Sequence, residues 1–198
     1  MAGCASLTAG LDPSCDALEK PGGLDQRFWV GERANITAYT VDGTTGDISG
    51  ITMASSTYLY SFIGRHLKHK TGHSINVGTN FNSFKQMMNA VLYYFTQAER
   101  DAIEDLVAAK DLVIFTQNTA GQIEVWGLDT KGGSTSYVVG GMNVESGEQD
   151  GGVELQDDTS FKIALSGNMR NMAKVFNEGT APFTLADNIA YLDALLAP

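Results

Sequence analysis

The amino-acid sequence predicts a mainly β fold, a β-sandwich or barrel flanked by one α-helix. A long loop, an N-terminal arm and a short C-terminal helix complete this predicted architecture. Glycine is abundant, at 22 of 198 residues, and proline occurs only 4 times, a balance that suits many turns. Short runs of β-branched and aromatic residues recur between the turns, as is typical of strands.

Breaks in composition divide the chain into an arm, a β domain and a second arm. Residues 1–25 contain two proline breaks and are predicted to be an N-terminal arm. Residues 26–177 form the predicted β domain, and residues 178–198 a C-terminal arm with a short helix. The first arm holds both cysteines, Cys4 and Cys15. They could pair after release into an oxidising medium or stay reduced in a cytoplasm.

Strand signals fill the first part of the β domain. A strand begins at residue 27 and loses its alternation around Gly31–Asn35. The turn-forming run Asp42–Asp47 separates it from a second strand and makes a hairpin. This second strand covers residues 48–54, and another strand is predicted at residues 57–64. Residues 64–83 are polar and locally basic, so they form either a long loop or an extended hairpin.

A helix is predicted over residues 97–109. Thr96 and Glu99 have the spacing of a capping box. Apolar residues then recur at three- and four-residue steps, and Lys110 is expected in the last turn. The flanking segments are rich in β-branched and aromatic residues, which indicates strand, helix, strand. One continuous helix from Ser83 to Lys110 is the alternative.

The second part of the domain alternates strands with turns. Asn118–Gly121 is predicted to close a hairpin, and Glu145–Asp158 to be a solvated loop with six carboxylates and no basic residue. Thr184 and Asp187 suggest a second capping box, which begins a helix that docks on its own body or on a neighbour. The expected total is eight to ten strands, which include segments at residues 111–117, 122–129, 134–146, 159–168 and 171–176.

The sequence offers few candidates for chemistry. His66, His69 and His73 would share one face of a helix and could bind zinc or copper. Lysines between them and the Thr71-Gly72 step favour an exposed basic loop, so we expect no metal there. The adjacent Asp157 and Asp158 would diverge on a strand, which favours a turn. No phosphate loop or nucleophile elbow is present, and five methionines are expected as core filler: Met87, Met88, Met142, Met169 and Met172. We therefore expect neither an enzyme nor a cofactor.

The net charge of −10 disfavours affinity for nucleic acid, because phosphate binding needs a basic surface. It does not disfavour DNA that passes without sticking. We find no segment long and apolar enough to span a membrane and no signal peptide, so we expect the protein to be made and used in a cytoplasm.

Three blocks of the chain resemble the tail tube proteins of long-tailed bacteriophages and, more distantly, the inner-tube proteins of contractile injection systems. The blocks are residues 28–54, residues 95–129 and residues 155–168. The resemblance implies a β-sandwich or barrel with one flanking helix. It also implies hexameric rings that stack into a tube, contacts with other tail proteins, and DNA passing through the lumen. The protein would belong to the virion tail and be assembled in the host cytoplasm.

Two other functions stay open at this point. The chain could be another phage structural protein, such as a head decoration or a ring at the head–tail junction, because the C-terminal helix is not part of the family pattern. A ligand-binding or enzymatic β-sandwich is the third possible function.

For a tube, we expect the basic residues Arg65, Lys68 and Lys70 of one ring to contact an acidic surface of the next ring, plausibly Glu145–Asp158.

Overall fold

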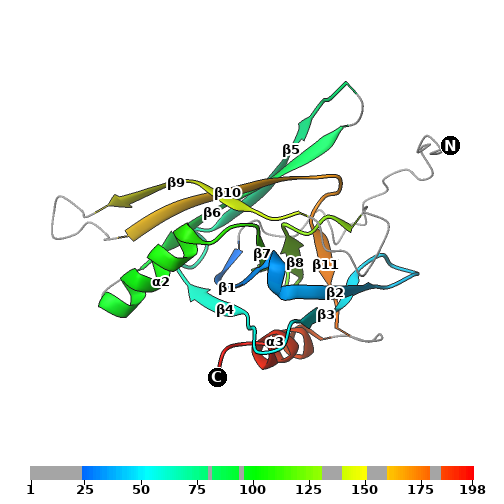
Figure 1. Ribbon diagram of the computed structural model, residues 1–198, viewed down its shortest axis with the longest axis horizontal. Helices are drawn as coiled ribbons and strands as arrows, with labels where there is room; N and C mark the ends of the chain where they lie inside the picture. The colour runs from blue at the N-terminus through cyan, green and yellow to red at the C-terminus, as the bar shows by residue number, and fades with distance from the viewer. Residues whose placement is uncertain (1–23, 80–81, 94–95, 131–139, 151–159, 179–183) are drawn as a thin grey trace.

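The computed structural model describes residues 24–79, 82–93, 96–130, 140–150, 160–178 and 184–198. These residues form eleven strands, slightly more than expected, together with two α-helices and one short 3-10 helix. Figure 1 shows two sheets lying across each other, with one helix at their side and the other beneath them. The predicted mainly β fold with a flanking helix and a short C-terminal helix is confirmed.

The larger sheet has seven strands and is built around a buried centre. Its spatial order is β2-β3-β11-β8-β7-β1-β4. The predicted hairpins β2–β3 and β7–β8 both form antiparallel pairs, and a 3-10 turn at Arg33–Asn35 separates β1 from β2. The strands of this sheet are β1 Leu24–Glu32, β2 Ile36–Val41, β3 Ile48–Met53, β4 Tyr60–Ile63, β7 Leu112–Asn118, β8 Ile123–Trp126 and β11 Lys174–Phe176.

The smaller sheet has the order β5-β6-β10-β9. It contains β5 (Lys70–Asn76), β6 (Ser83–Leu92), β9 (Asn143–Asp150) and β10 (Ser160–Met169). Strands β5 and β6 form the extended hairpin, so the long-loop alternative for residues 64–83 is wrong. The expected acidic loop is also wrong in its first part, because Glu145–Asp150 belong to β9, which pairs with β10.

Two cores lie on the two faces of the larger sheet. Strand β7 shows why, because its consecutive apolar residues are all buried. Leu112 and Ile114 face the core between the two sheets. Val113 and Phe115 face the core between the larger sheet and the C-terminal helix. A strand buried on both faces gives a continuous apolar run instead of an alternating one. Met88, Met142 and Met169 are buried as expected, but Met172 is exposed.

Helix α2 (Gln97–Ala108) closes one side of the core between the sheets. Its capping box is present, since Thr96 Oγ1 accepts from the Glu99 amide and the Glu99 carboxylate accepts from the Thr96 amide. Ile103 and Leu106 pack into that core. The alternative of one helix from Ser83 to Lys110 is wrong, because β6 ends at Leu92 and the helix begins only at Gln97. Lys110 lies beyond the helix, which has no basic residue in its last turn.

Helix α3 (Leu185–Ala194) docks on the chain's own body. The predicted capping box of Thr184 and Asp187 is present. Leu192 is fully buried in the second core. Asp193 accepts hydrogen bonds from the Arg27 guanidinium and from Trp29 Nε1 at 2.9 Å, both on β1. Of the two docking alternatives, the structure shows the first.

Candidate assembly surface

The outer face of the four-stranded sheet is open and polar. Along β6 and β10, alternate residues such as Met88 and Ile163 point into the core. The residues between them therefore point outward, and Asn89, Lys162 and Asn168 are exposed there. In Figure 1, neither helix of the described residues lies over this face.

The lysines of this face are paired with carboxylates of β9. Lys162 Nζ lies 3.3 Å from Glu148 Oε1, directly across the β9–β10 pair. Lys85 donates to Glu145, which reaches across β10. The hydrogen bond from Lys85, and next the one from Ser166, lowers the pKa of the Glu145 carboxyl. Two positive charges that could bind phosphate are thus offset by β9.

Strands β5 and β9 are the two edges of the sheet. Lys70 begins β5, and Lys68 is exposed in the turn before it, where Arg65 is partly buried. The acidic residues Glu145 and Glu148 lie at the opposite edge, so a single chain does not bring the basic and acidic groups of the predicted contact together. Asp157 and Asp158, like Cys4 and Cys15, lie outside the described residues.

The three histidines go to three separate places. His69 is only 3% exposed, its Nδ1 accepts from the Val91 amide, and its Nε2 lies 3.3 Å from the Gln26 carbonyl oxygen. The expected exposed loop is therefore wrong for this residue. His73 stacks on a tryptophan of β8, whereas His66 contacts Asp25. In the described part of the chain, no three or more His, Cys, Asp or Glu residues form a metal site. The absence of bound metal at these histidines stays a prediction.

His69 is buried and His73 is half-buried, and the surroundings of both lower the pKa of the imidazole. His73 Nε2 accepts from the Ala173 amide at 2.9 Å. Because His69 Nδ1 and His73 Nε2 each accept a backbone N–H, neither nitrogen can carry a proton without losing that bond. Burial lowers the pKa of the His73 imidazole. Burial also lowers the pKa of His69, against smaller opposing effects of the Gln26 carbonyl and the Asp25 charge.

We expect the free energy of unfolding to fall as the pH drops below about 6.5, the ordinary pKa of histidine. Below that pH the unfolded chain binds protons at these histidines and the folded chain does not. The histidines therefore leave the free energy of unfolding unreduced above that pH, and it declines as the pH falls toward the lowered folded-state pKa values.

The pKa of the Glu124 carboxyl is raised by burial, so Glu124 has the opposite effect on the free energy of unfolding at lower pH. Urea unfolding from pH 7 to about pH 5 measures this. The His69→Gln/His73→Gln variant should lose most of the slope, and an unchanged slope in this double variant would contradict the assignment.

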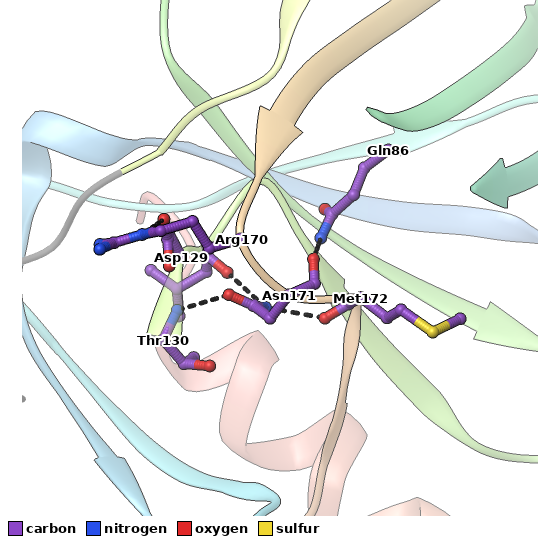
Figure 2. Close-up of polar contacts among 7 residues, drawn as sticks. Gln86, Asp129, Thr130, Arg170, Asn171 and Met172 are labelled. Carbon is purple, nitrogen blue, oxygen red and sulfur yellow. Dashed lines mark hydrogen bonds and ion pairs between the residues drawn. The ribbon is translucent and has the colours of Figure 1, made fainter. Parts of the chain in front are cut away.

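A buried polar network joins the two sheets next to this surface (Figure 2). Asn171 accepts from the Thr130 amide at 2.8 Å and donates to the carbonyl oxygens of Leu128 and Met172. Gln86 of β6 donates to the Asn171 carbonyl oxygen at 3.0 Å and accepts from the amide that follows β8. The network fixes how β6 and β10 sit on the larger sheet. Sequence analysis did not predict it, since no motif marks these residues.

An ion pair lies at the rim of the same network. Arg170 Nε donates to Asp129 Oδ2 at 2.8 Å (Figure 2). The Asp129 side chain is nearly buried, while the Arg170 side chain is partly exposed. The pair extends the contact between the end of β10 and the segment after β8.

No protein-family model, curated protein or solved structure matches the chain. Neither helix of the described ranges has the length and apolar character that crossing a membrane demands.

Proposed function

We propose that the chain is a structural subunit of a phage tail tube, which assembles into rings that stack around a channel for DNA. The observation that carries the proposal is the four-stranded sheet. It presents an open polar face together with two edges, β5 and β9, that pair with no further strand among the described residues. Exposed edges invite pairing with another chain, and a closed ring satisfies them.

The two edges differ, which favours a ring over a twofold dimer. Joining β5 of one copy to β9 of the next uses each edge once and repeats the same rotation, a head-to-tail contact that gives a ring when the rotation closes. Six copies per ring is the number that the family resemblance implies.

The polar face is proposed to line the channel. DNA that moves through a channel must not be held by its phosphates. The pairs Lys85–Glu145 and Lys162–Glu148 offset the positive charges on this face. The net charge of −10 per chain acts in the same direction. This role needs no catalytic side chain, and we assign none.

Negative-stain electron microscopy of the purified protein tests the proposal. Tubes with a central channel are the expected result. Single rings that never stack would instead favour a ring at the head–tail junction. A protein that stays monomeric at high concentration, without rings or tubes, would contradict the proposal.

We further expect Arg65, Lys68 and Lys70 to contact the acidic segment of the next ring. Replacing all three with Glu should shorten tubes at low salt and leave rings intact, because each exposed pair contributes up to about 1 kcal/mol and is repeated around the ring. Tube length by microscopy at low and high salt measures the effect, which should fade as salt screens the charges.

A charge-conserving variant provides the control for this experiment. Arg65→Lys/Lys68→Arg/Lys70→Arg keeps the three positive charges, so it should stack like the parent. Tubes of parental length from the triple Glu variant at low salt would show that these residues have no part in stacking.

A further inference from the structure

A groove runs between helix α2 and the edge strand β4. It consists of two adjoining cavities of about 440 Å³ and 450 Å³. Tyr60, Phe62 and Ala102 line both cavities, and Leu106 lies at the floor of the first. Tyr60 is largely exposed despite its size. A contiguous apolar surface of this kind on a folded chain marks a place where something else binds.

The groove has an acidic rim. Glu32 and Asp105 line the first cavity, and Glu99 lines the second. All three residues are exposed. Among the described residues that line the two cavities, none is Lys or Arg. A fitting occupant is therefore apolar at its contact point and free of carboxylates.

The end of the β5–β6 hairpin has these properties. Ile75 is 65% exposed and Val77 is 85% exposed. His73, two residues before Ile75, still stacks on Trp126 of the larger sheet, so the apolar side of the hairpin continues past the body that covers it. The sequence has no Asp or Glu from Gly64 to Ala98.

We infer that the hairpin end of one copy docks in the α2–β4 groove of a second copy, with Ile75 and Val77 against Tyr60 and Phe62. Figure 1 shows the hairpin end and helix α2 at opposite ends of the molecule, so a chain cannot fill its own groove. The contact is head-to-tail and can be repeated by every copy. The inference rests on the proposed function for its place in an assembly, and it names the partner surface of the hairpin.

Charge reversal at both sides of the contact tests the docking. Val77→Asp places a carboxylate against the acidic rim and should raise the protein concentration needed for half-maximal assembly at least tenfold. Asp105→Lys in the same chain should restore most of the loss, because the new ammonium faces the new carboxylate. Val107→Asp makes the same change at an exposed position of α2 outside the groove and should assemble like the parent. Light scattering at increasing protein concentration measures all four chains.

A cysteine crosslink separates this inference from the ring proposal. Chains with Cys4→Ser and Cys15→Ser receive either Val77→Cys or Ala102→Cys, and the two are mixed under mild oxidation. A disulfide-linked pair that forms only in the mixture is the expected result. If the disulfide-linked pair forms but no rings are seen, the result would support the docking and contradict the proposed ring assembly. Rings without the pair, or Val77→Asp assembling like the parent, would overturn the docking.

Discussion

Replacing Asn171 with Ala should lower the free energy of unfolding by about 3–5 kcal/mol. The side chain is 4% exposed and makes three hydrogen bonds with the backbone of Leu128, Thr130 and Met172. Alanine removes all three and leaves backbone groups unpaired in a place with little access to water. Each such group costs about 1–3 kcal/mol. Urea unfolding measures the difference, with equal slopes confirming that both chains unfold alike.

Asn89→Ala is the matched control, because Asn89 is exposed on the outer face of β6. It should change the free energy of unfolding by no more than about 0.5 kcal/mol. Asn171→Asp should be nearly as damaging as Asn171→Ala, since a carboxylate cannot donate to the carbonyl oxygens of Leu128 and Met172. A loss below about 1 kcal/mol for Asn171→Ala would show that water replaces the lost bonds.

The local parts of the fold were predictable from the sequence. A capping box involves only two residues that are three positions apart, so it can be recognised in the sequence. Both helices begin with one, formed by Thr96 and Glu99 and by Thr184 and Asp187. The turn at Asn118 likewise indicates a hairpin. The side-chain oxygen of Asn118 accepts hydrogen bonds from two backbone amides of this turn. In each case the signal and the structure lie within one stretch of chain.

The polar network was not predictable for the opposite reason. Asn171 meets Gln86 across 85 residues of sequence and Thr130 across 41. Nothing in the residues beside Asn171 tells which distant backbone groups it will meet. The hairpin β5–β6 was ambiguous because one face of β5 is polar and solvated, while His73 turns inward to stack on Trp126. A histidine among polar residues gives no alternation from which a strand can be recognised.

The candidate surface was predicted only in part. Arg65, Lys68 and Lys70 stand out in the sequence because they are basic residues in an acidic chain. The sequence of Glu145–Asp158 predicts a loop, since glycines and carboxylates are uncommon in strands. In the structure Glu145–Asp150 belong to β9, which pairs with β10 and places Glu145 and Glu148 in ion pairs.

Changing Glu145 and Glu148 to Gln should convert the assembled protein from one that releases DNA into one that retains it. The substitutions remove the charge of Glu145 beside Lys85 and the charge of Glu148 beside Lys162. The fold should survive, because exposed ion pairs contribute no more than about 1 kcal/mol each. If the face lines a channel, the lysines of every copy then face the DNA with two fewer carboxylates beside them.

The salt dependence of binding is the measurement that identifies phosphate contacts. DNA that touches about 6–10 lysines should lose about 10³–10⁵ in affinity between 50 and 200 mM salt. Fluorescence anisotropy of a labelled double-stranded fragment, added during assembly, reports both the affinity and its slope with salt. The parent should show little binding at either concentration, because its lysines are already paired.

A second variant distinguishes the effect of the polar face on DNA binding from the effect of the net charge. Asp101→Asn/Glu104→Gln removes the same number of charges from exposed positions of α2, which is not part of the sheet. It should bind DNA no better than the parent. Equal binding by both variants would mean that total charge, and not the polar face, governs the response. Failure of the assembled Glu145→Gln/Glu148→Gln protein to bind DNA at 50 mM salt would contradict the proposal that this face lines the channel, because removing carboxylates beside lysines that face DNA should strengthen phosphate binding at low salt.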